Sequence, residues 1–159
     1  MTSPTINPQL LSSDAWNDTE SQNVKTVTRF VELLMNEHDF DAVLAAFNND
    51  RYRQHNRNLP EGIEGLVGFL RGFTEKFPEY SYDVKRIFAD GNHVVFHSHA
   101  TMKAADRGDD GKGWNIVDVW KVEDGKIVEH WDSIQSLDLM MRLYSVVAGG
   151  NVRNANGVF

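Results

Sequence analysis

The residues of this chain that could do chemistry gather in the stretch from Asn115 to Gln135. Asp118, His130 and Asp132 stand there among isoleucine, valine and tryptophan, and we refer to these three residues as the Asp-His-Asp cluster. Asp124-Gly125 indicates a tight turn, which places the cluster on two neighbouring strands. Because an unpaired charge buried among apolar groups is costly or shifts its pKa, we expect this hairpin to form the floor of a polar pocket.

Carboxylates that face a histidine inside an apolar cup can have pKa values close to neutral, and they can then move protons at a carbon or an ether oxygen. This is general acid/base chemistry, and it needs no cofactor. Two simpler explanations stay open. Asp118 and His130 could form a buried hydrogen-bonded pair that only fixes the register of the strands, and Asp132 could be a solvated residue at the end of its strand.

The length of the turn decides whether the cluster shares one face of the sheet. A two-residue loop (124–125) puts Asp118 on the face opposite the other two members. A three-residue loop (123–125) with its glycine left-handed pairs Val122 with Lys126 and puts all three members on one face. We favour the second loop, because it also places the apolar residues that flank the cluster on that face.

A second group of polar side chains is the run Gln54, His55 and Asn56, which follows an extended piece of chain. These three side chains are good hydrogen-bonding groups, and we expect them to bind a substrate in the pocket. The alternative is a junction between a helix and a loop, in which the polar groups are satisfied by their own backbone.

His97 and His99 lie on one face of an expected strand and superficially match the metal-binding opening of a cupin. No carboxylate follows them at cupin spacing, so we expect no bound metal. His97 is better explained as a hydrogen-bond donor in the pocket, and His93, beside a turn, as a solvated residue. Trp120 belongs to a set of aromatic residues that usually form core, although one or two of them could line the cavity.

Composition bounds the classes of function that remain. The chain has 159 residues, 41% of them hydrophobic and 25% charged, which fits one globular domain. A formal net charge of −7 argues against a nucleic-acid or anionic-membrane surface and favours a small molecule or another protein as partner. The absence of cysteine excludes disulfides, a thiolate nucleophile and cysteine-bound zinc. With neither a long apolar run nor a signal-peptide pattern at the start, we expect a soluble, cytoplasmic protein.

The elements that position these residues follow from periodicity. Helical spacing covers residues 19–36, capped by Asp18 or Thr19, residues 40–47, capped by Asp39, and residues 63–77, with a last helix over 137–147. Alternation indicates strands over 80–89, 93–102, 114–122 and 126–134. Helices followed by strands define an α+β fold in which the helices cover one face of a curved antiparallel sheet. We expect a flexible arm over 1–15, a single domain over 16–148 and a polar tail over 149–159.

Several of these motifs occur together in a known family. They are Tyr52-x-Gln54-His55-Asn56, Gly62 opening a helix, Ala89-Asp90-Gly91 before the strand with His97, Val117-Asp118-x-Trp120, and the block from Asp124 to Gln135 that contains Glu129-His130-Trp131-Asp132. From about Val24 to Gln135 the chain resembles the SnoaL-like branch of the nuclear transport factor 2-like superfamily.

The resemblance implies a cone-shaped α+β barrel, in which N-terminal helices pack over a curved antiparallel sheet and enclose a pocket, and usually a homodimer formed through the sheet. Asp132 looks like the general acid/base residue of the SnoaL polyketide cyclases, with His130 and Asp118 as groups that tune it. Gln54, His55, Asn56, His97 and Trp120 are the candidates for substrate binding.

The resulting hypothesis is a cofactor-independent acid/base enzyme that acts on a small, largely apolar molecule by aldol-type cyclisation, isomerisation, hydration or hydrolysis. The alternative is a non-catalytic module of the same fold that binds a small molecule or a protein.

Overall fold

The computed structural model describes residues 4–148 and 155–156. The helices are α1 (Asp18–Val31), α2 (Phe40–Phe47), α3 (Gly62–Lys76) and α4 (Leu139–Ala148), and the strands are β1 (Arg53–Gln54), β2 (Ser81–Asp90), β3 (His93–Thr101), β4 (Trp114–Glu123) and β5 (Lys126–Ser136). A π-helical stretch, Glu32–Glu37, continues α1. Helices thus precede the long strands, and the expected α+β class is confirmed. Of the tail expected over 149–159, only Ala155 and Asn156 lie within the described residues.

Local capping explains where the first two helices begin. Asn17 Oδ1 accepts a hydrogen bond from the Glu20 amide (3.0 Å) and Glu20 Oε2 accepts one from the Asn17 amide (2.9 Å), which is a complete capping box. The cap therefore lies one residue before the earlier of the two expected positions, Asp18 and Thr19. Asp39 caps α2 as expected.

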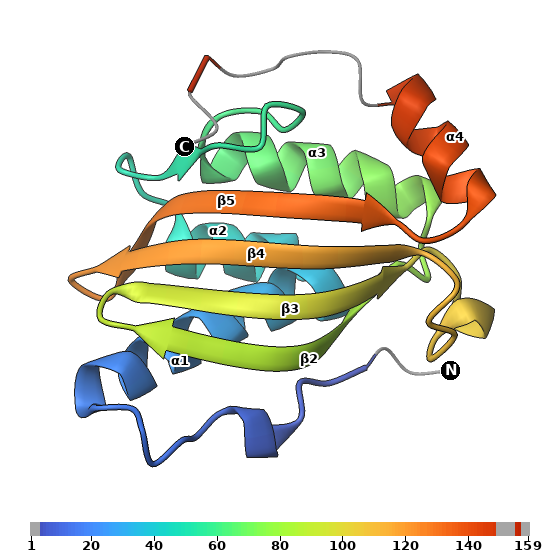
Figure 1. Ribbon diagram of the computed structural model, residues 1–159. Coiled ribbons are helices and arrows are strands. Elements are labelled where there is room, and N and C mark those ends of the chain that lie inside the picture. The colour runs from blue at the N-terminus through green and yellow to red at the C-terminus, as the bar shows by residue number, and fades with distance from the viewer. Residues whose placement is uncertain (1–3, 149–154, 157–159) are drawn as a thin grey trace.

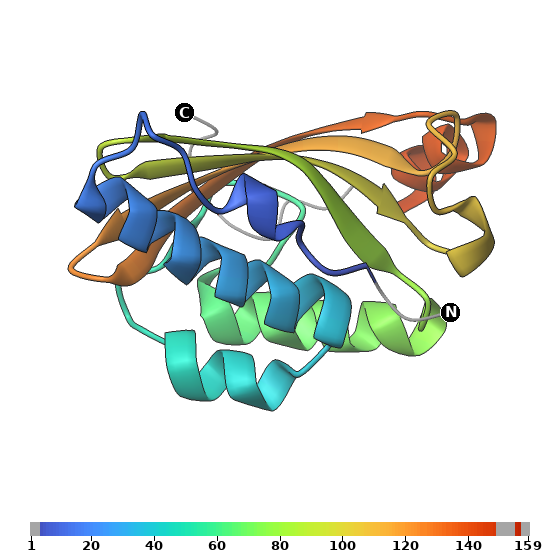
Figure 2. The same cartoon turned by 90° about the horizontal axis from the view of Figure 1, so that it is seen from below.

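The sheet is five-stranded, curved and open, in the order β1-β5-β4-β3-β2 (Figure 1). The four long strands pair antiparallel as expected, but the short β1 pairs parallel to β5, so the sheet is mixed. In Figure 2 the helices α1, α2 and α3 form a layer on one face of the sheet, which we call the inner face. The core lies between this layer and the apolar residues of the inner face.

The β4–β5 turn differs from the one expected. Glu123 lies opposite Lys126, and Asp124 and Gly125 have φ values of 52° and 72°. This is a two-residue hairpin loop with both central residues left-handed, as Asp-Gly favours. The three-residue loop with Val122 opposite Lys126 is therefore wrong.

A β-bulge beyond the turn restores the expected face. Val122 pairs with Ile127 and Lys121 pairs with Glu129, so Val128 is an extra residue on β5. Ile127 and Val128 are both buried although they are consecutive. Past the bulge Asp118 lies opposite Asp132 and Trp120 opposite His130, so the whole Asp-His-Asp cluster is on the inner face.

The described part of the N-terminal segment lies against the domain. Ile6 is buried in the core, and Leu10 and Leu11 pack against it. The flexibility expected for the arm over 1–15 stays a prediction. No helix within the described ranges combines the length and the apolar character that crossing a membrane requires.

Candidate functional site

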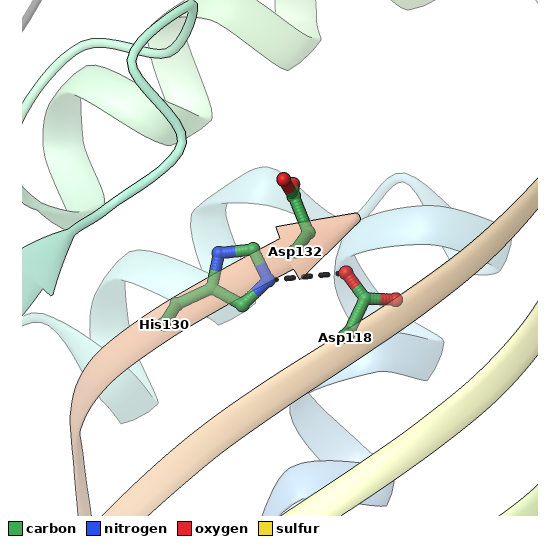
Figure 3. A group of neighbouring side chains, drawn as sticks. All are labelled: Asp118, His130 and Asp132. Carbon is green, nitrogen blue, oxygen red and sulfur yellow. Dashed lines mark hydrogen bonds and ion pairs between the residues drawn. The ribbon is translucent and has the colours of Figure 1, made fainter. Parts of the chain in front are cut away.

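The centre of the candidate site is a buried pair formed by Asp118 of β4 and His130 of β5. His130 Nε2 lies 3.1 Å from Asp118 Oδ1, and the two residues are only 5% and 2% exposed (Figure 3). The other carboxyl oxygen, Asp118 Oδ2, is buried and has no hydrogen-bond partner in the described structure. A buried acceptor of this kind is costly unless a ligand or a water satisfies it.

Gln54 of β1 holds the far side of the His130 ring. Its Oε1 lies 3.0 Å from His130 Nδ1, and its Nε2 donates to the hydroxyl of Tyr52 (3.2 Å). The Gln54 side chain is completely buried. The parallel pairing of β1 with β5 places Gln54 beside His130, although 76 residues separate them.

Asp132 has different surroundings from Asp118. It is half-buried, and the Asn56 side-chain amide donates to both of its oxygens, at 2.9 Å and 2.7 Å. In Figure 3 its carboxyl group projects from the same face of β5 as the His130 ring. Two carboxyl groups on one face therefore differ in exposure and in partner, which suits them to different roles.

Burial and charge shift the pKa values of the buried pair. Burial raises the pKa of Asp118 from its ordinary value of 3.8 to about 6, although the hydrogen bond with His130 opposes that rise. Burial by itself lowers the pKa of His130, but the hydrogen bond with Asp118 and the negative charges of Asp132 and Asp118 raise it above its ordinary value. Asp118 can therefore exchange a proton near neutral pH, and His130 holds its proton more strongly than an ordinary histidine.

Three buried tyrosines, Tyr52, Tyr80 and Tyr82, lie within the electrostatic reach of Asp118 and Asp132. Burial raises the pKa of each phenol further above its ordinary value, so each keeps its proton and can donate a hydrogen bond. None of the three was among the residues expected from the sequence to bind a substrate or to transfer a proton. The signal was available for two of them, because Tyr80 and Tyr82 share one face in the alternation that leads into β2.

His55 does not join the Asp-His-Asp cluster. Its ring stacks on Trp131 with a centroid distance of 4.6 Å, and its Nε2 lies 3.2 Å from Glu129 Oε2. Trp131 and Glu129 alternate with His130 and Asp132 along β5, so His55 lies on the outer face of the sheet. The expectation that His55 lies in the same pocket as the Asp-His-Asp cluster is therefore wrong.

His97 is also on the outer face, because it pairs with Val117 while Phe96 pairs with Asp118. Arg86 Nη1 lies 3.0 Å from His97 Nδ1, and His97 Nε2 lies 2.6 Å from Asn115 Oδ1. The expectation that His97 lines the same pocket as Asp118 is therefore wrong. Both of its ring nitrogens are engaged by protein groups, which also argues against the cupin-like metal alternative.

Trp120 lies on the inner face but is nearly inaccessible. It stacks on His130 at a centroid distance of 5.2 Å and meets Phe96 edge to face at 5.1 Å. Trp120 therefore packs against one face of the His130 ring and helps to hold it in place. Direct contact of Trp120 with a substrate stays a prediction.

Within residues 4–148 and 155–156, a donor set suited to a metal is found in the Asp-His-Asp cluster, whose ligand atoms lie within 4.8 Å of one another. These atoms already serve other contacts: His130 Nε2 faces Asp118, and both oxygens of Asp132 receive the Asn56 amide.

Two hollows lie elsewhere on the molecule. One has a volume of about 540 Å³ and borders the outer face of the sheet. Its lining includes Arg86, His97, His99 and Asn115. The other, of about 570 Å³, lies beside β1 and is lined by Tyr52, Glu61 and Asn156 among others. Neither of them is lined by the Asp-His-Asp cluster, so the pocket expected directly over the cluster stays a prediction.

The fold is shared with solved structures of nuclear transport factor 2-like proteins. One solved structure of this class, an NTF2-like protein of unknown function from Cytophaga hutchinsonii, matches with a TM-score of 0.53 and 20% identity, over 77% of this chain and 94% of that one. Within this class, the sequence profile of the SnoaL-like domain matches residues 27–130. The chain belongs to the SnoaL-like family, and Asp132 lies just beyond the matched region.

Other solved structures carry the same fold. A proposed polyketide cyclase from Bacillus cereus matches with a TM-score of 0.64 and 21% identity, over 91% of this chain and 93% of that one. A proposed SnoaL-like polyketide cyclase from a Jannaschia species matches with a TM-score of 0.63 and 19% identity, over 91% of this chain and all of that one. At such identities the likeness shows the fold alone. Among curated protein sequences no relative matches this chain.

Proposed function

We propose that this protein is a general acid/base enzyme that acts on a small, largely apolar molecule without a cofactor. Asp132 transfers the proton, and the Asp118–His130 pair sets its charge environment. The observation that carries the proposal is the contrast between two carboxyl groups on one face. Asp118 is 2% exposed, has an unpartnered oxygen and has its pKa raised to about 6, while Asp132 is half-buried and more open.

The surroundings of the cluster support chemistry at a carbonyl compound. A carboxylate can remove a proton from the carbon beside a carbonyl group, and buried phenols such as Tyr80 and Tyr82 can donate hydrogen bonds to the oxygen on which negative charge develops. Aldol-type cyclisation and isomerisation both begin with this step. Hydration or hydrolysis would use the same carboxylate to activate water. Similar solved structures include proposed polyketide cyclases, which agrees with the first of these reactions.

The substitution Asp132→Asn tests the proposal, since it keeps the shape and removes the base. We expect exchange of the α-hydrogens of small aromatic ketones in D₂O, followed by NMR, to fall by roughly 100-fold or more. Binding of the same ketones should change little. Asp83→Asn, on the outer face where Asp83 pairs with Lys85, is the matched control and should keep full exchange activity.

Unchanged exchange in Asp132→Asn would overturn the assignment of the base. If the wild-type protein binds the ketones but exchanges none of their hydrogens, the alternative of a non-catalytic binding module is favoured. A homodimer formed through the sheet and a cytoplasmic location belong to the proposal as well.

A further inference from the structure

We propose that Gln54 is a positioning residue that fixes His130 as the tautomer protonated at Nδ1, so that Asp118 and His130 share one proton between Oδ1 and Nε2. This inference rests on the proposed function, because it describes how the acid/base group is prepared. It also changes the role of Gln54, which the sequence suggested as a contact to the substrate.

The backbone of Asn56 fixes the orientation of the Gln54 amide, and the contact with Tyr52 agrees with it. The backbone N–H of Asn56 donates to Gln54 Oε1 (2.9 Å), which identifies that atom as the oxygen. Gln54 Nε2 lies 3.2 Å from the hydroxyl of Tyr52 and donates to it. An exchanged amide would set its NH₂ group against the Asn56 N–H, two donors facing each other, so the buried side chain keeps the orientation with Oε1 toward that N–H.

This orientation decides the protonation of His130. An amide oxygen only accepts hydrogen bonds, so the Nδ1 atom that lies 3.0 Å from Gln54 Oε1 must carry a proton. The contact between His130 Nε2 and Asp118 Oδ1 at 3.1 Å then requires one more proton. The pair is either an imidazolium with a carboxylate or a neutral imidazole with a carboxylic acid, and both forms hold the same number of protons.

Loss of the shared proton is disfavoured by both neighbours of the ring. With Nδ1 protonated, an unprotonated Nε2 would set its lone pair against the Asp118 carboxylate. If the remaining proton moved to Nε2, Nδ1 would set its lone pair against Gln54 Oε1. The burial of all three residues strengthens these repulsions. The raised pKa values of Asp118 and His130 agree with a pair that retains its proton.

The same short segment also orients the second carboxyl group. The Asn56 backbone holds Gln54, while the Asn56 side chain holds both oxygens of Asp132. A change in the path of this segment would therefore disturb both halves of the acid/base group.

The position of the proton can be measured directly by ¹⁵N NMR of the His130 ring in full-length protein, without any ligand. In wild type we expect Nδ1 to be protonated across neutral pH. Gln54→Met removes the acceptor at nearly constant volume, so the proton should move to Nε2 and the ring should titrate about one pH unit or more lower. Gln54→Glu keeps an acceptor at Nδ1 and should retain the wild-type tautomer with a titration shifted upward.

Gln135→Met is the matched control, because Gln135 accepts a hydrogen bond from Asn115 away from the cluster and should leave the His130 signals unchanged. A wild-type ring protonated only at Nε2, or a Gln54→Met ring that keeps Nδ1 protonated, would overturn the inference. If Gln54→Met does not fold, the wild-type tautomer and Gln54→Glu still decide. The NMR measurement does not depend on turnover. If the proposed catalysis fails, the tautomer of His130 is still tested independently.

Discussion

At the scale of single residues, the site depends on the different environments of two carboxyl groups that lie opposite each other. Asp118 is buried beside His130, while Asp132 is half-buried and held by Asn56. Burial penalises the charged form of a carboxyl group, and a hydrogen-bond donor favours it. The strand pairing brings the two groups together, and their neighbours give them different surroundings.

The pKa of Asp118 predicts how stability varies with pH. Because this pKa is about 6 in the folded state against an ordinary 3.8, the folded state binds the proton more tightly than the unfolded state. The contribution of Asp118 to stability is therefore complete below pH 3.8 and is lost as the pH rises through about 6. The raised pKa of His130 acts in the same direction, at higher pH.

We expect the free energy of unfolding of wild type, relative to Asp118→Asn, to fall by ~2–3 kcal/mol between about pH 4 and about pH 8. Urea denaturation of both proteins at several pH values measures this difference. A difference that is independent of pH would show that Asp118 titrates as an ordinary exposed carboxyl group.

At the scale of elements, irregularities in the strands put the site residues in place. The extra residue Val128 on β5 shifts the pairing by one position, and without it in the bulge His130 and Asp132 would face outward. The two-residue β1 has a similar effect, since its parallel pairing with β5 sets Gln54 beside His130. Such short features determine the site although they contribute little to the core.

The start of β4 gives a prediction at this scale. Gly113 has a φ of 74°, and a Cβ atom there would lie 2.1 Å from the carbonyl oxygen of Ala100. Its N–H also donates to Asp138 Oδ2 (3.0 Å), which links β4 to the start of α4. Gly113→Ala should lower the free energy of unfolding by more than about 2 kcal/mol.

The matched control is Gly68→Ala, at an exposed position inside α3 where a Cβ atom meets nothing within 4 Å. It should raise the free energy of unfolding by ~0.5–1 kcal/mol, because alanine favours a helix over glycine. Thermal and urea unfolding measure both effects, and equal stabilities for the two variants would contradict the close approach at Gly113.

At the scale of the whole molecule, the two faces of the sheet have different environments. Helices α1, α2 and α3 cover the inner face (Figure 2), while the outer face presents Val117, which is 37% exposed. Polar side chains surround it, among them His97 and Asn115, which are hydrogen-bonded to each other. A face of this mixed character can associate with a second copy.

We therefore predict a homodimer through the outer face, measured by light scattering on the purified chain. Val117→Lys should convert the dimer to a monomer, because it places a charge in the apolar part of that face. Leu143→Lys, at an exposed position of α4, is the control and should leave the dimer intact. A monomeric wild type, or a Val117→Lys protein that remains dimeric, would contradict the prediction.

Periodicity in the sequence was sufficient to predict the layers of the fold and the face of the sheet on which the cluster lies. Alternating apolar residues on β4 and β5 put Asp118, His130 and Asp132 on the face that carries Ile116 and Trp120. That alternation reflects burial of one face, which is a local property of each strand. It did not reveal the turn, because a two-residue loop with a bulge and a three-residue loop both leave the whole cluster on the inner face and differ only in the side taken by Lys126 and Ile127. Two consecutive apolar residues, Ile127 and Val128, were the feature of the sequence that indicated the bulge, because a regular strand buries only every second residue.

The tertiary structure decided which distant residues meet the cluster. Gln54 and Asn56 contact it, while His55 and His97 face the other side of the sheet. In β3 the apolar residues Val94 and Phe96 occupy inner positions. His97 follows Phe96 directly, so alternation along the strand already placed His97 on the outer face. For Gln54 no local pattern was available. Pairing between β1 and β5 depends on how the helical layer packs on the sheet, and a short edge strand has no periodicity that could specify its partner.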